Sequence, residues 1–227
     1  MGKSSFSGNL KDWINSLPPD VFVGTSLILC HEGRFLFGIR APKDIDGQII
    51  LELTGIGGAL EPEDYTLTSG ARREAVEELG VDVSILPSEE TLVVRSPQNI
   101  EHIHFTGSER PIAVIFRGFR TPPHMPWHTD NHGHSCLVIF QAKLEEKPRP
   151  AMELPYLIWL QPEQILALAQ DDITIGKLQK IGAELITGPM GFPALDWQAR
   201  LTDSQEALAL ALGENTADFY STCCSNL

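Results

Sequence analysis

The amino-acid sequence predicts an α+β fold or an α-β-α sandwich rather than a doubly wound parallel sheet. Segments rich in β-branched residues dominate the first two thirds of the chain, and helical patterns dominate the last third. The chain has 227 residues, of which 42% are hydrophobic, so it can bury the core of one ordinary domain with short extensions. The sequence has no internal repeat.

The first elements predicted along the chain are a short helix, a hairpin and a strand. Apolar residues from Leu10 to Leu17 follow the i, i+3, i+4, i+7 spacing of one helix face, and Pro18 ends the pattern. Residues 21–39 are typical of two strands joined by a turn at HEGR. Residues 49–53 predict a further short strand, which leads into the glycine-rich segment TGIGG.

A helix is predicted for residues 67–79, since both of its ends carry a capping residue. Asp64 or Thr66 can cap the N-terminus, and Gly80 stands at the C′ position. Later strands are predicted at VDVSI, ETLVVRS, PIAVIFRGF, SCLVIFQAKL and YLIWL, and later helices at QPEQILALAQ, residues 174–187 and DSQEALALAL. We therefore expect a helical N-terminal extension at 1–20, a main domain at 21–188, and a C-terminal helical extension with a polar tail at 189–227.

The composition and charge argue against two classes of partner. Lys and Arg number 17 against 30 Asp and Glu, which gives a net charge of −13 at pH 7 and a pI of about 4.9. Such a surface repels phosphates, so we expect neither a nucleic-acid polymer nor an anionic membrane as partner. No stretch is long and apolar enough for a transmembrane span, and the N-terminus lacks the apolar region of a secretory signal.

The cysteines and the loop histidines show no spacing typical of a metal site or a disulfide. The cysteines are Cys30, Cys136, Cys223 and Cys224. The histidines of the loop 121–135, which is rich in Pro, His and Gly, are His128, His132 and His134. We therefore expect no zinc site, and we predict a reducing, cytoplasmic environment.

Three glutamates crowd one edge of the predicted helix. Glu74, Glu77 and Glu78 fall within about one quadrant of the helix circumference. The adjoining apolar stripe consists of Leu67, Ala71, Ala75 and Leu79. Like charges at this spacing cost about 0.2–0.5 kcal/mol per pair, and a hard divalent cation such as Mg²⁺ turns that repulsion into affinity. The alternative is a solvated acidic face on which Arg72 and Arg73 act as intrahelical partners.

The stretch that contains these glutamates, GGALEPEDYTLTSGARREAVEELGV, resembles the Nudix box G-x5-E-x7-R-E-U-x-E-E-x-G-U, where U is apolar. The second half of the box matches from Arg73 to Val81. The first half fits only with one inserted residue. Gly57 and Gly58 then supply the glycine loop, and Asp64, or else Glu63, takes the place of the box glutamate.

The resemblance extends beyond the box and covers residues 22–185. SLILCHEGRFLFGIR is similar to the family's first hairpin, LELTGIGGALE to its strand entering the glycine loop, and ELPYLIWLQPEQIL to its closing segment. The resemblance implies a Nudix fold, with a mixed central sheet and the box loop and helix on one side. It also implies a Nudix-type pyrophosphohydrolase that uses Mg²⁺ or Mn²⁺ to cleave a nucleoside diphosphate linked to another moiety.

The resemblance assigns roles to the box residues. Glu74 and Glu78 would be the principal metal ligands, and Glu77 would bind a second ion or support a metal-bound water. The backbone carbonyl of Gly58, or of its neighbour Gly57, would reach the metal, because glycine permits a close approach. Arg73 would hold the box acid, which is the residue at the position of the box glutamate (Asp64, or else Glu63). The alternative is that Arg73 is an ordinary surface arginine.

The general base is predicted outside the box. Glu153 lies six residues before Trp159, where the family frequently carries a glutamate, and it completes the predicted catalytic set. Glu145 and Glu146 are the alternatives, although each is more typical of a solvated charge at a strand end. The predicted catalytic residues are therefore Glu74, Glu78, Glu153 and Arg73.

Three residues outside the box are predicted to bind substrate: Arg40, Pro97 and Trp127. Pro97 lies sixteen residues after Val81, where a proline accompanies ADP-ribose hydrolysis in some members, so an ADP-ribose-like substrate is favoured. Trp127 lies in the long loop 121–135, where it, Phe119 or the loop histidines could stack on a base, the alternative being a flexible rim. His102 and His104 share one strand face and either line the cleft or are structural.

A rival interpretation is a Nudix-fold nucleotide-binding or regulatory domain without turnover. The inserted residue favours this rival, whereas the intact set of Glu74, Glu77 and Glu78 favours catalysis. Under both interpretations the expected partner is a small nucleotide-like diphosphate and the expected cofactor is Mg²⁺ or Mn²⁺. The sequence leaves the oligomeric state open, with a homodimer as one arrangement.

Overall fold

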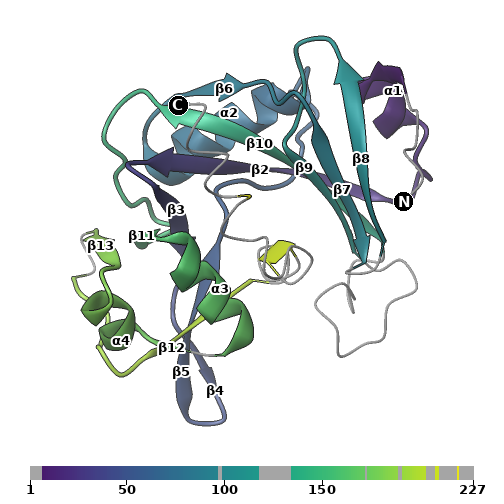
Figure 1. Cartoon of the computed structure of the whole chain (residues 1–227). Coiled ribbons are helices and arrows are strands. Elements are labelled where there is room, and N and C mark those ends of the chain that lie inside the picture. The colour runs from purple at the N-terminus through teal and green to yellow at the C-terminus, as the bar shows by residue number, and fades with distance from the viewer. Residues whose placement is uncertain are drawn as a thin grey trace.

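The computed structural model describes residues 7–96, 99–117, 134–171, 173–188, 191–202, 208–209 and 219. The fold is organised around strand β2 (Phe22–His31), which has neighbours on both sides (Figure 1). β2 runs parallel to β10 (Ser135–Leu144) and antiparallel to β3 (Arg34–Ile39), so the sheet is mixed. The predicted hairpin is confirmed, and its turn holds Glu32 and Gly33 at positive φ, 50° and 76°.

Two groups of strands extend from β2. On the side of β10 the order is β10, β9 (Ala113–Arg117), β7 (Thr91–Ser96), β8 (Asn99–Thr106) and β1 (Ser7–Asn9), and β6 (Val83–Leu86) pairs with the second half of β10. On the side of β3 the order is β3, β5 (Gln48–Thr54), β14 (Gln198–Leu201) and β12 (Ile173–Thr174). β11 (Tyr156–Leu160) pairs with β3 and with β13 (Glu184–Thr187), and β4 (Lys43–Ile45) pairs with β5.

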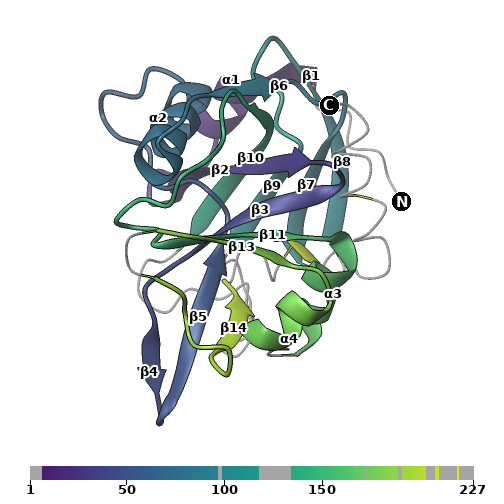
Figure 2. The ribbon, with the colours of Figure 1, turned by 90° about the vertical axis from the view of Figure 1, so that its left-hand side faces the viewer.

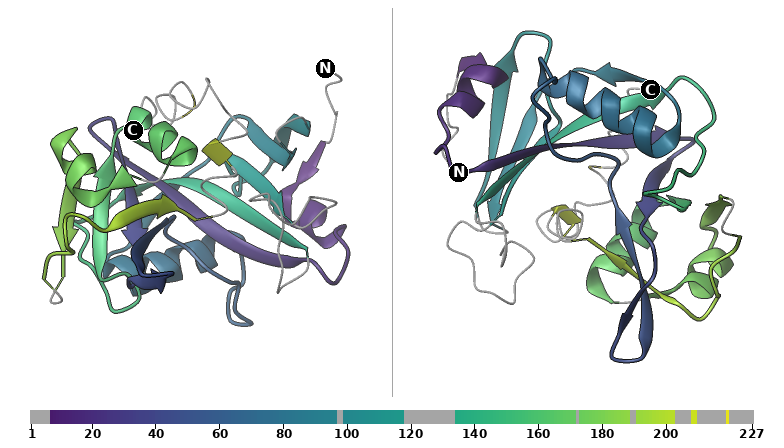
Figure 3. Two further views of the ribbon diagram at one scale, coloured as in Figure 1. Left: turned by 90° about the horizontal axis from the view of Figure 1, so that it is seen from below. Right: turned by 180° about the vertical axis from the view of Figure 1, so that it is seen from behind.

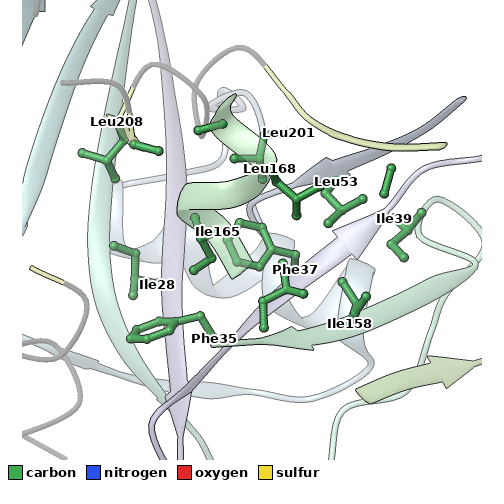
Figure 4. Close-up of a cluster of buried hydrophobic side chains, with 14 of the residues drawn as sticks. Ile28, Phe35, Phe37, Ile39, Leu53, Ile158, Ile165, Leu168, Leu201 and Leu208 are labelled. Carbon is green, nitrogen blue, oxygen red and sulfur yellow. The ribbon is translucent and has the colours of Figure 1, made fainter. Parts of the chain in front are cut away.

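Helices lie on opposite sides of β2 and β10 (Figure 3). On one side are α1 (Leu10–Asn15) and α2 (Leu67–Leu79), and on the other are α3 (Pro162–Gln170) and α4 (Ile175–Lys180). Leu27 and Leu29 of β2 pack into the core beneath α2. Ile28 packs into the second core with Ile165 and Leu168 of α3 (Figure 4). This mixed sheet, with the glycine loop and α2 on one side, confirms the predicted fold class.

α2 begins and ends at residues that the sequence indicates. The Thr66 hydroxyl accepts a hydrogen bond from Ser69 N (3.0 Å), and the Ser69 hydroxyl accepts one from Thr66 N (3.0 Å). Thr66 is therefore the N-cap, and the alternative, Asp64, is free for another role. Gly80 has φ 66°, a left-handed conformation that ends the helix.

Several segments differ from the elements predicted or add to them, among them the short strands β1 and β12. β4 was not predicted; it forms a hairpin with β5 that extends from the body (Figure 2), and Asp46 and Gly47 turn it with φ of 54° and 81°. The helix predicted for residues 174–187 is wrong in its second half, because Gly182, at φ 102°, turns the chain and residues 184–187 form β13. Within the C-terminal segment, β14 adds a strand parallel to β5.

The structure bears on two further predictions, the absence of a membrane span and the state of the cysteines. In the part of the chain that the structure describes, no helix is long and apolar enough to cross a membrane. Cys30 in β2 is disulfide-bonded, whereas Cys136 in β10 is buried and free. Disulfides depend on closeness in space, so the sequence spacing did not predict this bond.

Candidate metal centre and active site

The glycine loop that follows β5 lies directly against β2. Thr25 N donates a hydrogen bond to the Gly58 carbonyl (2.9 Å), and Leu27 N donates one to the Ile56 carbonyl (2.8 Å). Gly57 has φ 147°, and a Cβ there would lie 2.1 Å from the Thr25 carbonyl oxygen. Only glycine fits this position. The loop is therefore held as a short antiparallel extension beside β2.

The same two glycines face the carboxylates of α2. Gly57 N donates a hydrogen bond to Glu78 Oε2 (2.8 Å). A Cβ on Gly58 would lie only 2.6 Å from Glu74 Oε1, so the missing side chain allows the helix to approach. The Gly58 carbonyl, a predicted metal ligand, already accepts the hydrogen bond from Thr25 N. A metal contact would have to use its second lone pair.

Glu74 and Glu78 are buried, whereas Glu77 is exposed. Their residues are 8% and 6% exposed, and the Glu77 side chain is 53% exposed. Burial raises the pKa of Glu78 to about 8, and the charges of Glu74 and Glu153 act in the same direction. Burial is also the largest cause of the raised pKa of Glu74, which Arg73 opposes. Both carboxylates are therefore destabilised as anions, and a bound cation would relieve this.

Arg73 joins the glycine loop to α2. Its Nη2 donates to Asp64 Oδ2 at 3.1 Å, and its Nη1 contacts Glu74 Oε1 and Glu77 Oε2 at 2.9 Å each. The hydrogen bond from Arg73 lowers the pKa of Asp64, whose side chain is 5% exposed. Asp64, rather than the exposed Glu63, therefore stands where the box acid would meet its arginine.

The donor chemistry of this site fits a hard divalent cation, although two ligands must turn to bind it. Within the described ranges, no group of three or more His, Cys, Asp or Glu side chains is already gathered as a metal requires. Glu74 and Glu77 instead share the Nη1 of Arg73. Carboxylate oxygens are the donors that Mg²⁺ and Mn²⁺ prefer. The four glutamates Glu74, Glu77, Glu78 and Glu153 outnumber the nearby guanidinium groups of Arg73 and Arg40.

Glu153 and Arg40 reach this site from other elements. Glu153 is exposed in the segment before β11, and Arg40 is exposed directly after β3. Burial is the main influence on the pKa of Glu78, but the charge of Glu153 raises it and that of Arg40 lowers it. Glu153 also raises the pKa of Glu74. Both residues thus lie within electrostatic range of the buried carboxylates.

The other residues predicted from the sequence lie away from this site or outside the described residues. Glu145 and Glu146 line a separate cavity of about 490 Å³ beside Arg34, at the opposite end of β3 from Arg40. His102 Nδ1 contacts Glu90 Oε2 at 2.8 Å on the exposed side of β8. Trp159 is buried. The predicted residues outside the described ranges are Pro97, Phe119, Trp127, His128 and His132.

Sequence reasoning missed one residue beside the glycine loop, Thr25. It is 0% exposed, and its hydroxyl has no hydrogen-bond partner among the described residues. The available signal was a polar residue in the apolar strand segment GTSLILC, because buried strands rarely carry an unpaired hydroxyl.

Comparison with known proteins finds solved structures that are similar to this chain at low sequence identity. No protein-family model matches the chain, and no curated protein matches it. A solved structure described as a possible asymmetric diadenosine tetraphosphate hydrolase from Jonesia denitrificans is 19% identical, with a TM-score of 0.48, over 90% of this chain and 98% of that one. A Nudix-family hydrolase from Clostridium perfringens is 12% identical, with a TM-score of 0.45, over 88% and 97%. A C. elegans Ap4A hydrolase is 14% identical, with a TM-score of 0.42, over 66% and 88%.

Proposed function

We propose that this chain is a divalent-metal-dependent Nudix-type hydrolase that cleaves the diphosphate linkage of a nucleoside diphosphate joined to another group. One observation carries the proposal: the buried carboxylates of Glu74 and Glu78 face the glycine loop, with the charge of Glu153 nearby. Burying two carboxylates side by side costs stability, and a cation bound between them would offset that cost. The resemblance to the Nudix box supplies the reaction class.

The proposed metal ligands are Glu74 and Glu78, supported by Glu77 and the Gly58 carbonyl. A bound Mg²⁺ or Mn²⁺ would neutralise phosphate oxygens and lower the pKa of an attacking water. Glu78 keeps its orientation through the hydrogen bond from Gly57 N. The side chains of Glu74 and Glu77 both contact Arg73 and must rotate away from it to bind the cation.

The remaining roles fall to residues outside the carboxylate helix and to the box arginine. Glu153 is the proposed general base, which accepts the proton of the attacking water. Arg40 is the proposed contact for a negatively charged phosphate of the substrate. Arg73 holds Asp64 and thereby fixes the glycine loop relative to α2.

The first test is hydrolysis of a substrate panel by the purified chain with Mg²⁺ or Mn²⁺. The panel contains ADP-ribose, other nucleoside diphosphate derivatives, nucleoside triphosphates and dinucleoside polyphosphates, and products are separated by chromatography. ADP-ribose comes first because of the position of Pro97 in the sequence. We expect metal-dependent release of products from at least one member. Glu78→Gln should abolish this release, and Glu163→Gln, an exposed glutamate at the start of α3, should retain it.

The outcomes separate the enzyme from its rival. Metal binding without turnover of any panel member would favour a nucleotide-binding or regulatory domain. Undiminished turnover by Glu78→Gln would contradict the proposed metal centre. Turnover in the presence of a strong chelator would contradict the metal dependence.

A further inference from the structure

Thr25 of β2 carries a buried hydroxyl without a partner among the described residues. The residue is 0% exposed, and the solvent reaches essentially none of its Oγ1. A buried hydroxyl with no hydrogen bond lowers stability, and valine would fill the same space without this penalty. Such a group in a native structure calls for a functional reason.

The side chain of Thr25 points toward α2. β2 pairs with β10 in unbroken parallel register from Phe22 to Leu29, so its side chains alternate between the two faces of the sheet. Leu27, two residues along the strand, packs into the same core as Ala75 of α2. Val138, which lies opposite Thr25 on β10, belongs to that core as well. The Thr25 hydroxyl is therefore on the side of the sheet that carries the glutamates.

Along the strand, Thr25 lies opposite Gly58 of the glycine loop. Thr25 N donates to the Gly58 carbonyl at 2.9 Å. Gly58 also lies so close to Glu74 that a Cβ on Gly58 would be 2.6 Å from Glu74 Oε1. Arg73 Nη1 contacts that same Oε1. The structure thus brings a hydroxyl without a partner among the described residues and a buried carboxylate to neighbouring positions around one glycine.

We propose that Thr25 is a positioning residue whose hydroxyl donates a hydrogen bond to Glu74 when that carboxylate leaves Arg73 to bind a divalent cation. The inference rests on the proposed function. A carboxylate that binds a metal is oriented by a hydrogen bond from a neighbouring group, and loss of that bond weakens metal affinity. In a buried site the donor must come from the protein. Thr25 acts through Glu74 and contacts neither the cation nor the substrate.

Calorimetric titration of the full chain with Mn²⁺ alone, and with Mg²⁺ alone, tests this proposal. We expect Thr25→Val to weaken the affinity for either cation by about 10- to 100-fold. Thr25→Ser keeps the hydroxyl and should bind close to the wild-type affinity. Ser26→Ala is the matched control, because Ser26 is buried on the opposite face of the same strand and should leave the affinity unchanged.

Two further measurements distinguish positioning from a packing role. The melting temperature of metal-free Thr25→Val should equal or exceed that of the wild type, since the variant loses only an unpaired hydroxyl. In a Glu74→Gln background, Thr25→Val should have no further effect on affinity, because the charged acceptor is gone. A packing role would instead lower the melting temperature and persist in the Glu74→Gln background.

Each remaining outcome counts against a defined part of the proposal. Wild-type affinity in Thr25→Val would overturn the role of Thr25 and leave the metal centre standing. Equal weakening by Ser26→Ala would show a general effect of strand packing and would also overturn it. Failure of the wild-type chain to bind either cation would overturn the proposed function, and the role of Thr25 would fall with it.

Discussion

At the scale of single residues, Glu78 shows how the candidate site couples stability to pH. Burial raises the pKa of Glu78 to about 8 from the ordinary 4.5. In the metal-free folded chain the side chain therefore keeps a proton that the unfolded chain has already lost. By linkage, the stability associated with this proton is fully present below pH 4.5 and is lost as the pH rises toward 8.

Glu78→Gln should remove this pH dependence, because glutamine is neutral throughout and can still accept the hydrogen bond from Gly57 N. At pH 5 and without metal, we expect the free energy of unfolding of the variant to be only slightly higher than that of the wild type. The difference should grow by about 1.4 kcal/mol for each pH unit toward pH 8. Urea unfolding in the presence of a chelator measures this, with Glu163→Gln as control. Parallel pH curves for Glu78→Gln and the wild type would show that the pKa is not raised.

At the scale of the elements, the glycine loop and α2 act as one unit that Arg73 holds together. Asp64 reaches Arg73 through two contacts, from Nε at 3.4 Å and from Nη2 at 3.1 Å, and also accepts a hydrogen bond from Glu61 N (2.8 Å). Glu63, one residue earlier, is exposed. The inserted residue is thus accommodated in the chain between Asp64 and α2, and the acid and the arginine still meet.

Asp64→Asn should destabilise the chain, because it removes the charge from a buried partner of Arg73. We expect a loss of about 1–3 kcal/mol in the free energy of unfolding, measured by chemical denaturation. Glu63→Gln changes an exposed side chain and should stay within about 0.5 kcal/mol of the wild type. If the two variants lost equal stability, or if Glu63→Gln lost more, Asp64 would not be the box acid.

Local sequence patterns predicted the helices and strands that neighbouring residues determine. They missed those that depend on contacts between residues far apart in the sequence. α2 follows from its capping residues and its apolar stripe, and the β2–β3 hairpin follows from its turn. β13 was mistaken for helix, because its extended shape depends on Gly182 and on pairing with β11. Likewise the three glutamates were visible in the sequence, whereas the contribution of Thr25 depends on the register of β2 against the glycine loop.

At the scale of the whole molecule, β3 brings the parts of the site together. Ile39 pairs with Tyr156 of β11 on one side and with Leu53 of β5 on the other. The segment before β11, which carries Glu153, therefore lies beside the end of β3, which leads to Arg40. β5 continues into the glycine loop at this same end. The sequence could propose Glu153 only by resemblance, because no local pattern encodes this pairing.

The position of Glu153 leads to a prediction that depends on the tertiary fold. As the proposed general base, Glu153 should matter for the chemical step and little for metal affinity. Glu153→Gln should lower kcat by about 10²- to 10⁴-fold on a substrate that the panel identifies. Its calorimetric affinity for Mn²⁺ should stay within a few-fold of the wild type, since Glu74 and Glu78 remain to bind the cation.

Glu145→Gln provides the matched comparison, because Glu145 belongs to the cavity at the opposite end of β3. It should leave kcat and metal affinity close to their wild-type values. The reverse result, with kcat lost in Glu145→Gln and kept in Glu153→Gln, would place the base at the far end of β3. Because the glycine loop follows β5 beside the end of β3 that leads to Arg40, such a result would also require the substrate to extend along the whole strand, and the pairing of β3 with β11 could not be what assembles the site.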